Sequence, residues 1–380
     1  MKETMDTRTK LKLRRDVQTA MQFLKDGQLD AARDAFVAMV EAHPDVTLGY
    51  IGLGQVHMQE GDPETALKYF QDALEIDPQS AMALNMSARA REKLGDIDGA
   101  LEDYEEVGQL DPARGSSQIR MSRIFAKEGD LDEASTRLRE ALKRNPQQLA
   151  ARFMLAGNLE KSGDIAGAKE ELKRILEVNP QMGMAAYRLA MLQIRDKNYA
   201  EAEELLFTAI EQADDRPTPY ATLGFVLRAQ GKAEAALDAF EAAMELNPKS
   251  QPFALGAAEC MVDLGRHDDA LKTLRGALRG ARQTGPIHKR MGDVYVAMER
   301  PEQALEEYRA ALVGSPEFVA KHPDLPGMID EPGDPKAKAL KVKDYLANLA
   351  ETQRESGTTE RRFGGFRRNR NLRSFQATGA

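Results

Sequence analysis

Near the C-terminus, arginine and phenylalanine residues alternate in a pattern that could bind an anionic partner. The residues stand on both sides of the dipeptide Gly364-Gly365. Arginine contacts phosphates and stacks on aromatic rings, and phenylalanine offers a face on which a nucleic-acid base can stack. The segment could therefore bind RNA or an acidic protein surface. The candidate residues of this tail are Arg361, Arg362, Phe363, Phe366, Arg367, Arg368, Arg370, Arg373 and Phe375.

Side chains that could catalyse a reaction or bind a metal are few and scattered. The five histidines include no pair spaced for metal binding, and the single cysteine, Cys260, excludes an internal disulfide framework. Neither a nucleophile elbow nor a glycine-rich phosphate loop occurs. The helical pattern places Cys260 near a packed face, which favours a buried structural thiol. The sequence predicts a protein that is not an enzyme and that has no metal and no cofactor.

The overall charge argues against nonspecific DNA binding by most of the chain, because the 380 residues carry a formal net charge of −8 at pH 7. The first residues, MKETMDTRTKLKLRRDV, are charged and lack the apolar core of a signal peptide. No apolar run approaches the roughly 20 residues that cross a bilayer as a helix. We therefore expect a soluble, cytoplasmic protein without a membrane span.

Any binding residues must be positioned by a 34-residue unit that recurs nine times without insertion or deletion. Residues 61–78, GDPETALKYFQDALEIDP, show its second half: Gly61 can end a helix, Asp62 can cap the next one, and Pro63 fits its first position. An alanine marks each unit. These marker alanines are Ala32, Ala66, Ala100, Ala134, Ala168, Ala202, Ala236, Ala270 and Ala304.

Two further positions of the unit indicate how its helices pack. A large apolar residue follows each marker alanine by four positions, from Phe36 in the first repeat to Tyr308 in the ninth. A small residue precedes each marker by twelve positions, for example Ala20 or Gly54. The small residue lets a first helix approach a second helix closely, and the large residue fills the space beside it. The pattern predicts an all-α chain of helix pairs.

The chain resembles the tetratricopeptide repeat (TPR) family, whose unit is a 34-residue helix–turn–helix. The resemblance covers residues 13–318 and implies an α-solenoid that winds into a right-handed superhelix, with the first helices lining a concave surface. It also implies a protein-interaction scaffold or adaptor, without naming a ligand. The second repeat matches the family's motif best, with Tyr50, Leu53, Gly54, Gly61, Ala66, Phe70, Ala73 and Pro78.

Around the nine repeats of residues 13–318, we expect four further segments: a basic lead-in (1–12), a Pro/Gly-rich linker (319–335), a capping helix (336–355) and a disordered tail (356–380). A terminal helix suits a solenoid, because the last repeat needs a cap. In the sixth repeat Lys197-Asn198 replaces Gly-Asp, and we expect Asn198 to supply the left-handed residue of the turn. The joints at 211–219 and 280–286 also depart from the pattern. We interpret them as small changes in the pitch of the superhelix or, alternatively, as hinges.

The resemblance implies that positions 2, 5, 6, 9, 12 and 13 of each first helix face the concave groove. Thirteen basic and five acidic residues occupy these positions, an excess of +8 on a chain whose total is −8. Methionines lie between the charges and can repack around varied apolar partners. The candidate groove residues are Met82, Asn85, Met86, Arg89, Arg120, Arg123, Lys127, Met154, Met184, Tyr187, Arg188, Met191 and Arg195.

These residues predict a groove for an acidic or amphipathic partner segment. In an alternative interpretation, the methionines pack between repeats and the arginines pair with acidic residues of the chain. No repeat has Asn at position 9 of its first helix, so the resemblance does not extend to the TPR proteins that clamp the C-terminal carboxylate of chaperones. A second functional hypothesis is an RNA-associated factor that uses the tail. The sequence does not indicate an oligomeric state.

Overall fold

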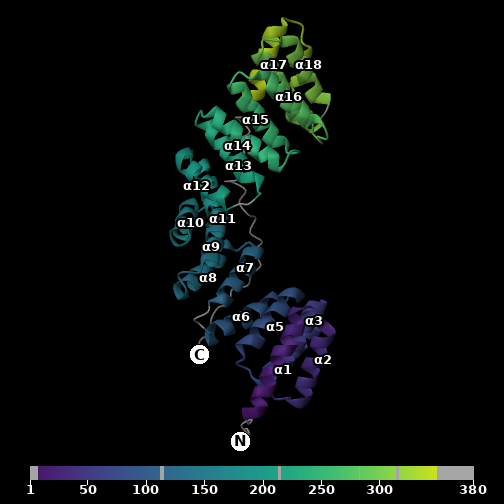
Figure 1. Cartoon of the computed structure of the whole chain (residues 1–380), viewed down its shortest axis with the longest axis vertical. Helices are drawn as coiled ribbons and strands as arrows, with labels where there is room; N and C mark the ends of the chain where they lie inside the picture. Colours follow the sequence, from purple (N-terminus) through teal and green to yellow (C-terminus); the bar gives the residue numbers. More distant parts are fainter. Residues whose placement is uncertain (1–6, 112–114, 213–214, 282, 314–315, 349–380) are drawn as a thin grey trace, which may run out of the picture. The chain divides into compact units, whose positions relative to one another are not determined.

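The computed structural model describes residues 7–111, 115–212, 215–281, 283–313 and 316–348, which contain helices and short connections and no strand (Figure 1). The chain divides into two compact units, residues 1–192 and 193–380. The boundary falls within α11. The predicted all-α solenoid of TPR helix pairs is confirmed, whereas its right-handed winding stays a prediction.

Through α18, odd-numbered helices are the first helices of the repeats and even-numbered helices are the second. The first unit contains α1 (Thr7–Lys25), α2 (Leu29–Ala42), α3 (Thr47–Glu60), α4 (Pro63–Ile76), α5 (Ala81–Leu94), α6 (Ile97–Leu110), α7 (Ser116–Glu128), α8 (Leu131–Arg144), α9 (Leu149–Ser162), α10 (Ile165–Val178) and most of α11 (Gly183–Arg195). The second contains α12 (Tyr199–Glu211), α13 (Pro217–Ala229), α14 (Ala233–Leu246), α15 (Gln251–Asp263), α16 (His267–Leu278), α17 (Gly285–Ala297), α18 (Pro301–Val313), α19 (Pro316–Lys321), α20 (Leu325–Asp330) and a helix at residues 335–348.

The turn between the two helices of a repeat forms as the sequence predicts. Gly61 adopts a left-handed conformation with φ of 84°, and the Asp62 side chain accepts a hydrogen bond from the Thr65 backbone N–H at 3.0 Å. Hydrogen bonds from the Thr65 side chain and from this backbone N–H lower the pKa of Asp62. The sixth repeat differs from our expectation, because Lys197 rather than Asn198 is left-handed, with φ of 62°. Asn198 instead takes the place of the helix N-cap, with φ of −82°.

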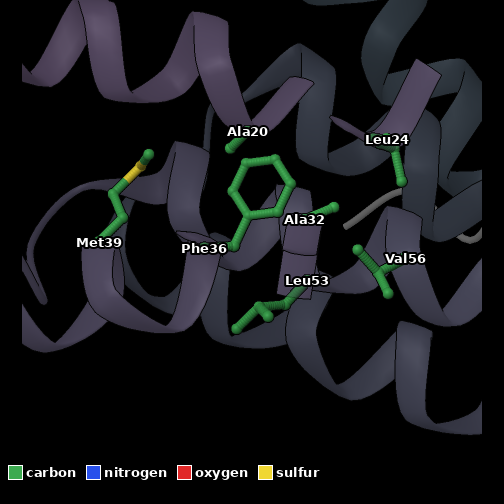
Figure 2. Packing of buried hydrophobic residues seen from close by; sticks show 7 residues of the cluster. All are labelled: Ala20, Leu24, Ala32, Phe36, Met39, Leu53 and Val56. Atoms are coloured by element: carbon green, nitrogen blue, oxygen red, sulfur yellow. The ribbon is translucent and has the colours of Figure 1, made fainter. Parts of the chain in front are cut away.

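The core follows the three marker positions of the repeat. All nine marker alanines and all nine large residues that follow them are completely buried. Figure 2 shows Phe36 of α2 pointing toward Ala20 of α1, with Leu53 of α3 on the same cluster. A Cβ atom on Gly54 would overlap the Phe70 ring, so this position needs glycine for the close helix approach. Figure 1 shows α1, α2 and α3 side by side, and each repeat therefore buries its apolar side against the next.

The C-terminal end of the described region differs from the sequence-based prediction. The segment 319–335, which we expected to be a linker, contains the end of α19 and all of α20. Leu325 and Ile329 of α20 are buried, and their apolar burial explains why a stretch rich in proline and glycine is helical. The helix expected at 336–355 begins at residue 335, and its predicted end lies outside the described residues, as does the tail.

Candidate functional site

The first helices α1, α3 and α5 carry two adjoining hollows. One, of about 360 Å³, is lined by Leu24, Gln55, Met58, Gln59, Met86, Arg89 and Lys93. The other, of about 420 Å³, shares Leu24 and Gln59 with the first. It is completed by Gln18, Met21, Gln22 and Lys25. The lining combines aliphatic and thioether groups with side-chain amides and cations, which suits a ligand that is partly apolar and partly polar.

Within the first hollow, the polar side chains are held by weak contacts. The Gln55 Nε2 group donates to the Met86 Sδ atom at 3.6 Å, and Arg89 Nη1 donates to the same sulfur at 3.4 Å. The Gln55 Oε1 atom is buried and has no hydrogen-bond partner. Lys93 Nζ donates to the Met58 carbonyl oxygen at 3.5 Å. Since thioether sulfur is a weak acceptor, Gln55 and Arg89 keep most of their hydrogen-bonding capacity for a ligand.

Contacts between neighbouring first helices follow a diagonal. Side chains 31 residues apart, three positions short of one repeat, contact one another in both units. Gln55 contacts Met86 in the first unit, and Glu259 contacts both Arg228 and Arg290 in the second. A residue at position 9 of one first helix therefore faces position 6 of the next. This relation identifies which candidate residues are neighbours.

We define the N-terminal face as the first-helix residues of the third and fourth repeats: Met86, Arg89, Glu92, Lys93, Arg120, Arg123 and Lys127. Within the described chain, none of its five cations makes an ion pair within 4.0 Å. Its one acid, Glu92, accepts a hydrogen bond from the Tyr104 hydroxyl. Burial and Glu92 raise the pKa of Tyr104, while Arg120 and Arg89 oppose that shift. Both guanidinium groups therefore lie in the electrostatic neighbourhood of the same hydroxyl.

Arg188, a sequence-predicted groove residue, is engaged inside the chain. Its Nε atom donates to Glu160 Oε2 at 2.8 Å, and its guanidinium group lies over the Phe153 ring at 5.3 Å from the centroid. A Cβ atom on Gly157 would stand about 3.1 Å from the same guanidinium, so the group also covers that backbone. Arg188 thus ties α11 to α9, as the alternative interpretation of the arginines expected.

The other candidate residues are dispersed. Met82, Met184 and Met191 are 41%, 58% and 43% exposed. Asn85, Met154 and Tyr187 are half-buried, and Arg195 is exposed and belongs to the second unit. Seven candidate residues lie on α5 and α7 of two consecutive repeats, and the other six lie on α9 and α11. The candidate residues of the tail all lie outside the described residues.

The C-terminal face, which we define as Arg228, Glu259, Asp263, Lys289, Arg290 and Asp293, is an ion-pair network. Arg228 pairs with Asp263 at 2.6 Å and with Glu259, which also pairs with Arg290. Asp293 pairs with Lys289 at 3.0 Å and with Arg290 at 3.4 Å. Its three bases and three acids balance one another. The first-helix residues of the seventh to ninth repeats therefore offer no unpaired cation to an acidic ligand.

Three further features of the described chain concern metal-binding side chains, the single cysteine and the length of the apolar helices. No group of three or more metal-binding side chains occurs among those residues. Cys260 is completely buried, and burial raises the pKa of its thiol to about 11, as expected for a structural rather than a reactive cysteine. None of the helices that the structure describes is both long and apolar enough to cross a membrane.

Sequence reasoning missed the glutamines of the hollows. Gln18, Gln55 and Gln59 occupy positions 6, 9 and 13 of their first helices, and Leu24 occupies position 12. These are the positions that the family resemblance assigns to the groove. The signal was present, but the candidate residues were chosen mainly for charge or as methionines, and Asn85 was the one amide among them. Amides donate and accept hydrogen bonds, which suits them to a ligand's main chain.

Comparisons with known proteins agree with the repeat architecture. A tetratricopeptide repeat model matches residues 92–159, 125–181, 159–223 and 227–289, and a second such model matches residues 18–81 and 51–114. No curated protein matches the chain.

Three solved structures illustrate the likeness. The C-terminal part of a TPR repeat-containing protein from Cytophaga hutchinsonii is 12% identical, with 63% of this chain and 98% of that chain covered and a TM-score of 0.56. PilF from Pseudomonas aeruginosa is 22% identical, with 61% and 99% covered and a TM-score of 0.44. YrrB, described as a TPR protein with an unusual peptide-binding site, is 19% identical, with 55% and 99% covered and a TM-score of 0.38. At such identity the likeness concerns the fold alone.

Proposed function

Because the chain belongs to the tetratricopeptide repeat family, whose proteins generally mediate protein–protein interactions, we propose that it is a non-enzymatic scaffold or adaptor. In this proposal the N-terminal face and the adjoining hollows bind an acidic or amphipathic segment of a protein partner. The observation that supports it is the set of cations on the N-terminal face that have no ion pair in the described chain.

Unpaired arginines are the strongest electrostatic feature of this surface. Charge-assisted hydrogen bonds from arginine to carboxylate are shorter than neutral ones and roughly twice as strong. Arg89 and Arg120 are half-buried, so water screens them less than it screens Arg123 and Lys127, which are exposed. A partner carboxylate would therefore gain most at Arg89 and Arg120. The hollow beside Arg89 would take the apolar part of the segment, with Met58 and Met86 adapting to its shape.

Affinity capture with charge-reversed variants tests this proposal. We would compare the natural chain with the variant Arg89→Glu/Arg120→Glu/Arg123→Glu. The matched control reverses three exposed cations of α8: Arg139→Glu/Lys143→Glu/Arg144→Glu. Partners captured by the natural chain and by the control should be lost from the N-terminal face variant, while circular dichroism stays unchanged. Capture should also weaken as salt concentration rises, because the Debye length falls below about 8 Å above physiological ionic strength.

The same capture separates the second hypothesis, an RNA-associated role for the tail. A chain that ends at Ser356 lacks the tail arginines and phenylalanines. If partners survive truncation and ribonuclease treatment but not charge reversal, the N-terminal face carries the function. If they are lost on truncation and on ribonuclease treatment, whatever the charge of the N-terminal face, RNA binding by the tail replaces the proposal.

A further inference from the structure

We infer that the partner segment places one side-chain carboxylate between Arg89 and Arg120, next to an apolar side chain that enters the hollow of α1, α3 and α5. This inference rests on the proposed function and specifies the chemistry that the N-terminal face would recognise. Its starting point is Glu259, an acid of the chain itself that joins two first-helix arginines in the second unit.

Glu259 shows how first helices of consecutive repeats share one carboxylate. Its Oε2 atom accepts from Arg228 of α13, and its Oε1 atom accepts from Arg290 of α17. One carboxylate on α15 thus bridges guanidinium groups from the helices on either side. The two oxygens of a carboxylate suit such a bridge, because each can accept more than one hydrogen bond.

The 34-residue register identifies which residues of the first unit occupy the positions of this bridge. Five repeats of 34 residues separate Arg290 from Arg120, Glu259 from Arg89, and Arg228 from Met58. An arginine therefore stands where the second unit has its bridging acid, and a methionine stands where it has the first arginine. The second unit supplies its own carboxylate. The first unit has two arginines on the same diagonal and no acid between them.

Arg89 and Arg120 cannot satisfy one another, since guanidinium groups only donate hydrogen bonds. Arg89 and Arg120 are 31 residues apart, the separation at which Gln55 contacts Met86 and Glu259 contacts Arg290, so they are neighbours by the same relation. The nearby Glu92 is held by that hydroxyl and forms no ion pair with either arginine within 4.0 Å. The first helices α5 and α7 also pack less closely than α3 and α5 or α15 and α17. A carboxylate from outside the chain would supply the ion-pair partner that neither arginine has within 4.0 Å in the described chain.

The apolar side chain of the partner would bind near Met58, which precedes Arg89 by 31 residues on the same diagonal. Met58 and Arg89 are 31 residues apart and both line the hollow of about 360 Å³. Leu24 and Met86 complete its apolar wall. A segment whose carboxylate reaches Arg89 and Arg120 would therefore bring a neighbouring side chain to the mouth of this hollow. A leucine, methionine or phenylalanine beside a glutamate fits this arrangement of surfaces.

Synthetic peptides test the inference on the full-length protein. The probes are fluorescein-labelled Gly/Ser peptides with one Leu and one Glu at every separation from one to four residues, in both orders. Matched probes carry Gln for Glu or Ala for Leu. Fluorescence anisotropy measures their affinity for the natural chain, for Arg89→Gln, for Arg120→Gln, for the double variant and for Arg139→Gln. Arg139 is an exposed residue of α8 and serves as the matched control.

We expect the best Leu/Glu peptide to bind roughly 10-fold more weakly after Arg89→Gln, after Arg120→Gln or after replacement of its Glu by Gln. Arg139→Gln should leave its affinity unchanged. Because one carboxylate would contact both arginines, the double variant should lose less than the product of the two single losses. The Gln peptide should bind the natural chain and the Arg89→Gln variant equally well.

Each other result overturns the inference in a distinct way. Equal losses for Glu and Gln peptides would show that Arg89 does not contact the carboxylate. Losses that multiply in the double variant would mean that the arginines contact separate groups. Leu peptides that bind independently of Glu and lose affinity after Met86→Ala would preserve the proposed function while removing the carboxylate. If no peptide binds, the inference fails, and the capture experiment above then decides the proposed function separately.

Discussion

The N-terminal face and the C-terminal face occupy equivalent positions of the same repeat and treat charge in opposite ways. In the C-terminal face Glu259 joins Arg228 to Arg290, and every charge has a partner. In the N-terminal face Arg89 stands at the position of Glu259, and Arg120 stands at the position of Arg290. Neither arginine makes an ion pair in the described chain. The backbone of the repeat is the same in both. The difference therefore comes from first-helix side chains, since Arg89, Lys93 and Arg123 stand where the C-terminal face has Glu259, Asp263 and Asp293.

In the second unit, first-helix charges bind consecutive repeats together, whereas in the first unit we propose that they bind a partner. Partly exposed ion pairs contribute modestly to stability when isolated and more when several charges form a network. The C-terminal network links α13, α15 and α17, and it gives the second unit lateral ties. The cations of the N-terminal face make no such ion pair in the described chain.

The largest expected effect concerns what the two units share, their core. Ala168 and Ala236 are marker alanines in different units, and both are completely buried. Replacing either with Phe should destabilise the chain by about 1–3 kcal/mol or more, because the helix pair has no room for the ring. Chemical denaturation followed by circular dichroism measures both variants. A silent variant would show that the repeat register is wrong at that position.

A smaller effect should distinguish the two faces. Arg228→Glu places a third acid beside Glu259 and Asp263, and we expect a loss of about 2 kcal/mol in the free energy of unfolding. The same reversal at Arg123 of the N-terminal face should change stability by less than about 0.5 kcal/mol, since Arg123 is exposed and has no ion pair in the described chain. Denaturant titration compares the two variants directly.

Cys260 offers an independent readout of the same difference. The buried thiol lies on α15, the helix that carries Glu259, and its raised pKa keeps it protonated near neutral pH. A thiol reagent should therefore label the natural chain slowly. Arg228→Glu should accelerate labelling by loosening this helix, whereas Arg123→Glu should not. Equal labelling rates in both variants would argue that the C-terminal network does not stabilise the second unit.

The smallest expected effect is a pH dependence at the C-terminal end of the second unit. Burial, Lys289 and Lys321 lower the pKa of His322. The centroid of its ring lies 4.3 Å from the centroid of the Phe318 ring. The folded chain therefore binds this proton less readily than the unfolded chain, in which histidine titrates near pH 6.5. Stability should be fully present above about pH 6.5 and should fall as the pH decreases below that value.

His322→Phe provides the comparison for this prediction, because it keeps an aromatic ring beside Phe318 and removes the titrating nitrogen. Other groups also titrate in this range, so the informative quantity is the difference between the natural chain and the variant. We expect the melting temperature of the variant to fall less between pH 7.5 and pH 5.5. Identical slopes would show that His322 does not contribute to the pH dependence.

The sequence predicts the parts of the fold that depend on one position at a time. The marker alanines, the turn at Gly61 and the cap at Asp62 could all be identified, since each reflects a local steric or hydrogen-bonding requirement. The left-handed conformation of Lys197 was missed. Lys197 and Asn198 are adjacent, and asparagine has the higher intrinsic preference for the left-handed conformation, so the sequence favoured Asn198.

The candidate site was less predictable for a different reason. Family positions indicate which residues lie on the first helices, but not which long side chains reach across to one another. Arg188 and Arg120 occupy the same position of their repeats, yet Arg188 pairs with Glu160 and Arg120 has no ion pair in the described chain. The preceding first helix carries a glutamate at the same position in both cases, but Glu92 accepts a hydrogen bond from the Tyr104 hydroxyl, whereas the fifth repeat has Leu172 at the position of Tyr104. The diagonal of 31 residues could be recognised only from the structure.

The most direct test of this account compares the two faces in one binding measurement. The best Leu/Glu peptide would be titrated into the natural chain, into Arg89→Gln/Arg120→Gln and into Arg228→Gln/Arg290→Gln, with fluorescence anisotropy as the readout. The account predicts a loss of about 10-fold or more for the first pair and a change within about 2-fold for the second, whose arginines already hold Glu259. Equal losses for both pairs, or a loss confined to Arg228→Gln/Arg290→Gln, would contradict it.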